Sequence, residues 1–505
     1  MSRPVRTRFA PSPTGPLHIG GVRTALYAYL FAKKHQGTFL LRIEDTDTAR
    51  TVVGSETLIN KTLEWCGIIP DEGVCEGGAF GPYKQSERKE IYIKYAHELV
   101  AKGKAYYAFD TEEEIASWRE KTASENNGNA AFYGFATRMQ LRNSLSLPEA
   151  EVKTLMDSNT PFVIRLKVEP EDTVVFNDII RGQVKFEVNQ LDDRVLLKSD
   201  GMPTYHLANV VDDYLMQITH VIRGEEWLAS TPHHVLLYRG FGWEAQMPVF
   251  AHLPLLLKPD GKGKLSKRDG DRLGFPVFAL EWLNPETQEK SIGYKERGFL
   301  PQAFVNFLAL LGWNDGSDQE IFSMDALIDS FSLERVQKAG AKFNFEKATW
   351  FNQQYIQKLD ISYLSDLFNT FLKEKGIHKD TAFVNQYCAL FRERITFLHE
   401  LNTVGSYLYQ DITFYDTETY QKKYKPEVEI FKEQFIEALL KIESLDVTKV
   451  EILFKSLLEQ LQMKIGEVMP IFRILLTGIM QGPPVFDTIN LLGAEESIVR
   501  LKKQI

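Results

Sequence analysis

Residues 8–21 read RFAPSPTGPLHIGG and join a strand-like segment to a helix-like segment through a loop rich in proline and glycine. The leading segment, Val5–Ala10, is typical of a short strand, and helical spacing of apolar residues begins after His18. Pro11 and Pro13 restrict the loop to few shapes. A helix that starts after such a loop points free backbone N–H groups and the positive end of its dipole at an anion. We therefore expect an α/β fold with an anion-binding loop after its first strand.

Strand and helix patterns alternate over residues 1–105, stop, and resume over 205–254. This alternation predicts a Rossmann-like parallel sheet with helices on its faces, and such sheets bind ligands at the carboxyl ends of their strands. The intervening residues 106–204 are first polar and helix-prone and then form short alternating runs, which indicates an α+β insertion. We expect one catalytic domain that this insertion interrupts in sequence.

The last part of the chain has helical periodicity. Leu364 and Phe368 belong to an i, i+3, i+4, i+7 stripe of apolar residues, and similar stripes recur further on. After about residue 280 we find no strand-like alternation of any length. We expect an all-α region over 346–505, with residues 255–345 between it and the catalytic domain.

The bulk properties exclude several classes of protein. With 505 residues, 44% apolar and 25% charged, the chain is a folded protein of about two to four domains. A net charge of −9 argues against indiscriminate nucleic-acid binding but not against a local basic face. Three cysteines without C-x-x-C spacing favour a reducing compartment, and we find no signal peptide and no apolar run long enough for a membrane span. We expect a cytoplasmic protein that does not contact a membrane.

A second loop, Lys258–Arg272, reads KPDGKGKLSKRDGDR and combines cations with glycines. Such a loop can be a solvated basic surface, or it can be a mobile lid whose ammonium groups stabilise charge on a leaving pyrophosphate. Because the chain also contains the loop at 8–21, the lid is the favoured interpretation. We expect Lys264 and Lys267 to act together with His18 on the phosphates of a nucleotide.

The run RIEDTD at 42–47 follows the second expected strand. Its carboxylates can bind an ammonium group, a ribose hydroxyl or Mg²⁺, or they can only favour the start of a helix. Glu44 favours a functional role because it lies at the carboxyl end of a strand. For Asp45 and Asp47 the two interpretations stay equally open.

Two further segments, TYHLANVVDDYL and HVIRGEEWL, bracket one strand and turn. Tyr205 and Asn209 lie four residues apart and hence on one face of a helix. Arg223 can bind a carboxylate with two parallel hydrogen bonds. These side chains can form part of a substrate site, or they can form a buried polar network that supports the sheet.

All these segments resemble those of class I aminoacyl-tRNA synthetases, and most closely those of bacterial-type glutamyl-tRNA synthetases, over essentially the whole chain. HIGG at 18–21 and KLSKR at 264–268 stand where the class signatures read HIGH and KMSKS. RFAPSPTG, LRIEDTD, TYHLANVVDDYL and HVIRGEEWL are more specific and occur in the family's order. Gly21 replaces the last histidine of the signature, at a position that commonly varies in the glutamyl branch. Lys104–Phe109 lacks the cysteines that hold zinc in many relatives, so we expect no structural zinc.

The resemblance implies a reaction in two steps without a protein nucleophile. ATP, with Mg²⁺, and L-glutamate give glutamyl-adenylate and pyrophosphate, and the glutamyl group then passes to the terminal adenosine of tRNA(Glu). The insertion would bind the acceptor end of the tRNA, residues 255–345 would carry the KLSKR loop and contact the stem, and residues 346–505 would bind the anticodon. Relatives often need bound tRNA before they activate glutamate, and we expect the same of this chain. We also expect the protein to be a monomer.

The same resemblance assigns roles to individual residues. The catalytic residues would be His18, Lys264 and Lys267. The ATP-binding residues would be Thr14, His18, Gly20, Gly21, Glu226, Trp227, Lys264, Ser266 and Lys267. The glutamate-binding residues would be Arg8, Ala10, Ser12, Glu44, Tyr205, Asn209 and Arg223. The candidates for tRNA binding are Arg392, Arg394 and Arg473, and no residue is expected to bind a metal ion directly.

Four other identities share part of this pattern. A tRNA-modifying glutamyl transferase has the catalytic domain but lacks the anticodon unit, and glutaminyl-tRNA synthetase carries β-barrels at its C-terminus. A small nucleotidyltransferase would not need the tRNA-binding extensions. A non-catalytic tRNA-binding paralogue disagrees with the intact His18, Lys264, Lys267 and Arg223. The sequence does not decide whether tRNA(Gln) is charged as well.

Overall fold

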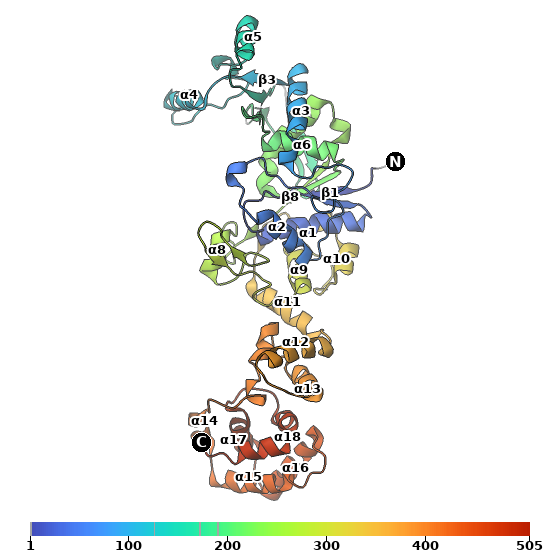
Figure 1. Ribbon diagram of the computed structural model, residues 1–505, viewed down its shortest axis with the longest axis vertical. Coiled ribbons are helices and arrows are strands. Elements are labelled where there is room, and N and C mark those ends of the chain that lie inside the picture. The colour runs from blue at the N-terminus through green and yellow to red at the C-terminus, as the bar shows by residue number, and fades with distance from the viewer. Residues whose placement is uncertain (1–2, 126, 171–172, 189–190) are drawn as a thin grey trace. The chain divides into compact units, whose positions relative to one another are not determined.

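The computed structural model describes residues 3–125, 127–170, 173–188 and 191–505 (Figure 1). The chain divides into two compact units. The first unit contains residues 1–297 and 301–348, and the second contains residues 298–300 and 349–505. The finer boundaries expected after residues 105, 204, 254 and 345 stay predictions.

A six-stranded sheet in the order β2-β1-β8-β9-β5-β6 lies at the centre of the first unit (Figure 1). Its neighbouring strands run parallel, except that β6 is antiparallel to β5. The strands are β1 (Arg6–Phe9), β2 (Thr38–Leu41), β5 (Val174–Asp178), β6 (Gly182–Phe186), β8 (His220–Gly224) and β9 (Val249–Leu253). The sheet confirms the expected Rossmann-like α/β fold. Because β5 and β6 lie within 106–204, the central sheet takes two strands from the range expected for the insertion.

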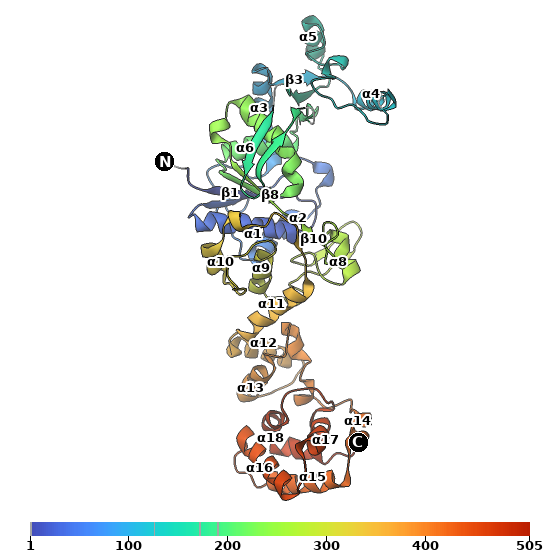
Figure 2. The same ribbon diagram turned by 180° about the vertical axis from the view of Figure 1, so that it is seen from behind.

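Helices cover both faces of this sheet (Figures 1 and 2). Helix α1 packs on β1, β2 and β8, and α9 and α10 pack against α1 in turn, while α3, α6 and α7 pack together on the opposite face. The helices are α1 (Ile19–Lys34), α2 (Ser55–Trp65), α3 (Lys89–Ala101), α6 (Tyr205–Leu215), α7 (Thr231–Phe241), α9 (Pro301–Ala309) and α10 (Met324–Ser330). Leu207 and Val211 of α6 and Val235 of α7 are buried in the core of the opposite face, as the spacing of an amphipathic helix requires.

The insertion contains a separate three-stranded antiparallel sheet in the order β3-β4-β7. Its strands are β3 (Ala105–Ala108), β4 (Val163–Leu166) and β7 (Val195–Leu197), and two helices, α4 (Glu112–Glu125) and α5 (Glu149–Asp157), lie beyond this sheet (Figure 2). The hydroxyl of Tyr106 donates a hydrogen bond of 2.6 Å to Asp193, and Arg138 forms an ion pair of 3.2 Å with the same carboxylate. These buried contacts fix the sheet to the segment that leads back to α6.

Short strands follow where only helices were expected after residue 280. A two-residue pair joins β11 (Trp282–Leu283) to β12 (Lys290–Ser291), and β10 (Leu256–Leu257) pairs in parallel with β13 (Ala341–Lys342). The expectation that the chain contains only helices after about residue 280 is therefore wrong for residues 282–291 and 341–342. Strands of two residues are too short to produce an alternating pattern in the sequence.

The described residues of the second unit form helices joined by loops and contain no β-strand. Its helices are α11 (Phe345–Gln357), which begins in the first unit, α12 (Ile361–Glu374), α13 (Thr381–Phe391), α14 (Thr417–Lys423), α15 (Pro426–Leu439), α16 (Val447–Gln460), α17 (Ile465–Thr477) and α18 (Val485–Leu501). The side chains of Asp360, Asp380 and Asp446 accept hydrogen bonds from the first turns of α12, α13 and α16, which fixes where these helices begin. The expected all-α C-terminal region is confirmed. Among the described residues, no helix combines the length and apolar character that a membrane span requires.

Candidate active site

A cavity of about 660 Å³ opens where β1 and β8 end, as parallel α/β sheets lead one to expect. Phe9 at the end of β1 and Gly224 at the end of β8 both line it. Every residue expected to bind ATP or glutamate also lines it, with the exception of Ser266. The two signature loops, far apart in the sequence, therefore meet at one cavity.

His18 is held in one orientation at the start of α1. Its Nδ1 accepts a hydrogen bond of 3.1 Å from the backbone N–H of Gly20, so the proton of the neutral ring lies on Nε2. Burial and then the nearby Lys264 and Lys267 lower the pKa of His18 to about 4, which keeps the ring neutral at pH 7. Nε2 is buried without a hydrogen-bond partner. The ring can therefore donate one hydrogen bond to an anion in the cavity.

Gly15 and Gly21 of the first loop are each favoured over other residues for a different structural reason. Gly15 has a φ of +122°, and a Cβ built there would lie 3.4 Å from Nζ of Lys267, so both its backbone and its neighbour favour glycine. A Cβ on Gly21 would lie 2.8 Å from Cδ1 of Leu17. A histidine at position 21 would therefore have to displace Leu17, which gives a local reason for the departure from the class signature.

The cations of the second loop face the first loop. Nζ of Lys264 forms an ion pair of 2.8 Å with Glu226, which also lines the cavity. Nζ of Lys267 lies 5.8 Å from the centre of the Phe278 ring, and no ion pair of Lys267 occurs among the described residues. Partial burial lowers the pKa of Lys267. Lys267 is thus the cation in this loop that faces the cavity without a carboxylate partner.

Ser266 differs from the expectation that it contacts the nucleotide. Its hydroxyl donates a hydrogen bond of 2.5 Å to Asp269, and its backbone N–H donates to the same carboxylate at 2.9 Å. The second of these bonds is one half of a capping box at the start of α8 (Lys267–Leu273), and in the other half the side chain of Ser266 accepts from the backbone N–H of Asp269. Ser266 therefore fixes the helix that begins at Lys267, and it does not line the cavity.

Arg223 lies near the end of β8 and lines the cavity. Its Nη1 donates a hydrogen bond of 2.6 Å to the hydroxyl of Tyr205, and its Nη2 donates at 3.2 Å to the backbone oxygen of Trp227. The rings of Tyr205 and Trp227 lie 4.6 Å apart between centroids. Together with the bonds from Nε to His252 and from Nη2 to Thr231, these contacts occupy four of its five N–H groups. One N–H of Nη1 therefore remains for a carboxylate in the cavity, and the expected pair of parallel hydrogen bonds is not available in this arrangement.

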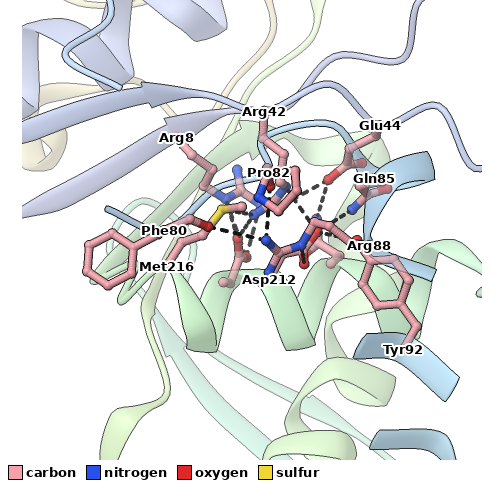
Figure 3. Close-up of polar contacts among 12 residues, drawn as sticks. Arg8, Arg42, Glu44, Phe80, Pro82, Gln85, Arg88, Tyr92, Asp212 and Met216 are labelled. Carbon is pink, nitrogen blue, oxygen red and sulfur yellow. Dashed lines mark hydrogen bonds and ion pairs between the residues drawn. The ribbon is translucent and has the colours of Figure 1, made fainter. Parts of the chain in front are cut away.

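A buried charge network lies beneath the same wall (Figure 3). Asp213 accepts hydrogen bonds from Nε of Arg8 at 3.1 Å and from Nη1 of Arg42 at 2.8 Å. Nη2 of Arg42 donates at 2.9 Å to Oε1 of Glu44, which also accepts at 3.0 Å from Asn209. Loss of Asp213 would remove the described ion pair of the buried Arg8, a defect that costs about 3–5 kcal/mol, while Arg42 would keep Glu44 and Asp212 as partners.

This network leaves two atoms facing the cavity. No hydrogen bond to Oε2 of Glu44 or from Nη1 of Arg8 occurs in the described part of the chain, and both residues line the cavity. Burial raises the pKa of Glu44 against the opposing effect of Arg42 and Arg8. The pair therefore offers one carboxylate oxygen and one guanidinium nitrogen to a ligand that carries both an ammonium and a carboxylate group.

The two undecided aspartates have different environments. Asp45 accepts hydrogen bonds from the backbone and hydroxyl of Ser86, at 2.8 Å and 2.7 Å, and is buried. Asp47 lines the cavity, pairs with Arg50 at 2.6 Å and is half exposed. The structure thus places Asp45 in a structural contact and leaves Asp47 available to a ligand.

Sequence reasoning missed the buried partners of this site. Asp212 accepts from Arg88 at 2.7 Å and from Gln85 and Tyr92, each at 2.8 Å (Figure 3). The available signal was the pair of aspartates at the end of α6, an otherwise apolar helix. Charged residues in an apolar element are seldom fully buried unless they are paired.

The three arginines expected to bind tRNA lie in the second unit but not in one cluster. Arg394 and Arg473 both interact with Tyr407, and Nη1 of Arg473 donates at 2.7 Å to the backbone oxygen of Pro483. Arg392 instead donates at 3.3 Å to the backbone oxygen of Leu359. The tRNA-binding role of all three stays a prediction.

Two family profiles match consecutive parts of the chain. The profile described as "tRNA synthetases class I (E and Q), catalytic domain" matches residues 4–350, and the profile of an anticodon binding domain matches residues 352–505. Glutamate–tRNA ligases of Amoebophilus asiaticus and Flavobacterium johnsoniae are 50% and 51% identical to the chain, over 99% and 100% of it and over 98% and 99% of their own lengths. The chain belongs to the class I glutamate–tRNA ligases.

Solved structures of the family agree with the fold. A glutamate tRNA ligase from Elizabethkingia meningosepticum, solved in complex with its amino acid, superposes with a TM-score of 0.95 at 47% identity and covers 99% of this chain and 98% of its own. The synthetase from Elizabethkingia anophelis has a TM-score of 0.91 at 47% identity over 98% of each chain. The family consists of ATP-dependent ligases, and its anticodon binding domain is the part that the tRNA-modifying transferases lack.

Buried histidines of the first unit predict how its stability depends on pH. The pKa of His206 is lowered to about 3 and that of His18 to about 4, in both cases chiefly by burial, and burial also lowers the pKa of His234. In the unfolded chain a histidine has a pKa of about 6.5, so between pH 6.5 and 4 the unfolded state binds more protons. Stability is therefore retained above pH 6.5 and falls as the pH is lowered, by up to about 1.4 kcal/mol per pH unit for each histidine.

We expect the melting temperature of the first unit to fall steadily from pH 7 to pH 5. Differential scanning calorimetry at constant ionic strength measures it directly. A melting temperature that stays constant or rises over this interval would show that these rings are protonated in the folded chain.

Proposed function

We propose that the cavity binds ATP beside L-glutamate and that the chain joins this glutamate to the terminal adenosine of tRNA(Glu). The observation that supports the proposal most strongly is that both signature loops and Arg223 line one cavity. An oxygen of the α-carboxylate attacks the α-phosphorus of ATP, and the bond to the bridging oxygen breaks to release pyrophosphate. The 2′-hydroxyl of the terminal adenosine then attacks the carbonyl carbon of glutamyl-adenylate and releases AMP.

The first of these steps needs positioning and charge stabilisation but no protein nucleophile. His18 donates a hydrogen bond from its Nε2–H to a phosphate oxygen, and Lys264 and Lys267 stabilise the charge that develops on pyrophosphate. Each such donor contributes about 10²–10³-fold to the rate. The other residues proposed to contact ATP are Thr14, Gly20, Gly21, Glu226 and Trp227. Ser266 acts indirectly, through its cap on α8.

Lys264 must exchange partners during this step. Its ion pair with Glu226 at 2.8 Å occupies the ammonium group before a nucleotide binds. A triphosphate carries more charge than one carboxylate and attracts the lysine away from Glu226. Glu226 is then free to accept a hydrogen bond from the nucleotide.

The glutamate pocket lies at the wall of the cavity that contains Arg223, Glu44 and Arg8. Arg223 binds the side-chain carboxylate, and Oε2 of Glu44 faces the α-ammonium group, while Nη1 of Arg8 is directed to the α-carboxylate. The amide of glutamine carries no charge to pair with the guanidinium of Arg223 and replaces one acceptor oxygen by an N–H₂ group, which costs affinity. Ala10, Ser12, Tyr205 and Asn209 complete the pocket.

We assign Mg²⁺ to the nucleotide. Among the described residues no group of three or more His, Cys, Asp or Glu side chains could hold a metal ion, which fits an ion bound mainly by phosphates and water. The ion would supply charge neutralisation on the triphosphate. The absence of structural zinc stays a prediction, as do a monomeric state and a cytoplasmic location.

Pyrophosphate exchange and tRNA charging test this function together. With tRNA(Glu) present, we expect exchange that depends on glutamate and charging that consumes ATP. Leaving out the tRNA measures whether activation requires it, and replacing it by tRNA(Gln) measures whether that tRNA is also charged. If glutamate supports neither exchange nor charging of tRNA(Glu), the proposed function is wrong.

A further inference from the structure

Two buried residues, Asp178 and His252, lie next to Arg223 but do not line the cavity. Oδ2 of Asp178, at the end of β5, lies 2.6 Å from Nδ1 of His252 in β9. Nε2 of His252 in turn lies 3.1 Å from Nε of Arg223. The side chains of Asp178 and His252 are fully buried, and neither residue lines the cavity. The strands β5, β9 and β8 thus connect Asp178 to Arg223 through one imidazole ring.

Hydrogen bonding determines where the protons of this chain lie. Asp178 also accepts from the backbone N–H groups of Ile180, Arg181 and His252, at 3.0, 2.8 and 3.1 Å. Burial alone would raise the pKa of Asp178, but the hydrogen bonds from His252 and Arg181 lower it, and the carboxylate stays ionised. An ionised Asp178 requires a proton on Nδ1 of His252. Nε2 is then an acceptor that receives the Nε–H of Arg223, and it also lies 3.2 Å from the hydroxyl of Thr231, which itself accepts from Nη2 of Arg223.

The charge of Arg223 is not neutralised by this arrangement. No ion pair of Arg223 occurs in the described part of the chain, and its other partners are the hydroxyls of Tyr205 and Thr231 and the backbone oxygen of Trp227. A carboxylate in direct contact would fix the guanidinium group but would also compete with a substrate carboxylate. A neutral imidazole fixes the group without competing.

We infer that Asp178 and His252 are positioning residues that hold Arg223 in one orientation and leave its charge for the side-chain carboxylate of glutamate. This inference rests on the proposed role of Arg223 in the glutamate pocket. It makes Asp178 and His252 determinants of the choice of glutamate over glutamine, although neither contacts the substrate.

The substitution Asp178→Asn reverses the proton arrangement. An asparagine that keeps its oxygen toward the backbone N–H groups of Ile180 and Arg181 presents its NH₂ group to Nδ1 of His252. The imidazole proton must then move to Nε2, where it meets the Nε–H of Arg223, donor against donor. A misplaced guanidinium binds glutamate less well, while the ATP and tRNA sites are unchanged.

Steady-state charging of tRNA(Glu) separates this role from a general loss of structure. We expect Asp178→Asn and His252→Phe to raise the KM for glutamate about 10- to 100-fold, as expected for an unpaired buried donor. The KM values for ATP and tRNA(Glu) should stay within about twofold. His252→Gln, whose side-chain oxygen can accept from Arg223, should recover most of the loss that His252→Phe causes. The preference for glutamate over glutamine should fall in the two damaging variants and not in His252→Gln.

The matched control is Asp192→Asn. Asp192 pairs with His233 at 3.3 Å in the same unit but has no described contact with Arg223, so its substitution should leave the KM for glutamate unchanged. If Asp178→Asn does not fold, the comparison of His252→Phe with His252→Gln tests the inference. Equal KM values for glutamate in His252→Phe and the unsubstituted chain, or equal losses in His252→Phe and His252→Gln, would overturn the inference. If Arg223→Gln also left this KM unchanged, the proposed glutamate pocket itself would be wrong.

Discussion

Replacing Lys267 by alanine is expected to lower the rate of glutamate activation by about 10²–10³-fold while tRNA binding stays close to normal. Nζ of Lys267 lies beside Gly15 and over the ring of Phe278, and no described carboxylate pairs with it. Its charge is therefore available to the phosphates, and the transition state gains more from it than the ground state does, because charge develops on the leaving pyrophosphate. Pyrophosphate exchange in the presence of tRNA(Glu) measures the rate, and a filter-binding titration measures tRNA affinity.

The matched control for this experiment is Lys262→Ala. Lys262 is a cation in the same glycine-rich loop, but it does not line the cavity. Its loss removes the same formal charge from the protein and should change the exchange rate by less than about threefold, since Lys262 does not line the cavity and an exposed charge away from the phosphates is screened by solvent. Unchanged exchange in Lys267→Ala, or equal losses in both variants, would contradict the role given to the loop.

Replacing Arg223 by glutamine is expected to lower kcat/KM for glutamate by at least about 10²-fold and to favour glutamine relative to glutamate. The guanidinium group of Arg223 is buried and held by Tyr205 and Trp227. Arg8 also lines the cavity, but Asp213 holds its Nε and Nη2. A neutral amide cannot compensate the charge of the side-chain carboxylate, but it can pair with the amide of glutamine. Charging of tRNA(Glu) with each amino acid, over a range of concentrations, gives both ratios.

Arg239→Gln is the corresponding control. Arg239 lies on α7, is partly exposed, donates at 3.2 Å to the backbone oxygen of Thr173 and does not line the cavity. Its substitution should leave kcat/KM for glutamate and the relative use of glutamine unchanged. A similar change in both variants would point to a general loss of structure, and no change in Arg223→Gln would remove Arg223 from the pocket.

The parts of the site that could be predicted from sequence are those that a short segment determines by itself. The loop at 11–16 and His18 are close in sequence, so their shape and the start of α1 depend on local geometry. The position of the cavity followed from the strand and helix alternation, because parallel sheets bind ligands at the carboxyl ends of their strands. The capping box of Ser266 and Asp269 was missed, and Ser266 was assigned to ATP binding instead, although a serine followed three residues later by an acidic residue is a local signal for the start of a helix.

The parts that could not be predicted depend on register between distant segments. Arg8 and Asp213 are 205 residues apart, and their contact exists only because the fold brings α6 close to β1. The same holds for Asp178, which joins the central sheet through β5 although its segment resembles an insertion strand. A strand's place in a sheet is set by its neighbours, and its own sequence does not reveal it.

The preference for glutamate over glutamine in charging tRNA(Glu) tests the central claim most directly. The claim is that one cavity binds ATP and selects a side-chain carboxylate through Arg223. We expect kcat/KM for glutamate to exceed that for glutamine by about 10⁴-fold or more, the range typical of a site built to pair with one polar group. Comparable values for the two amino acids, or charging with glutamine alone, would contradict the claim.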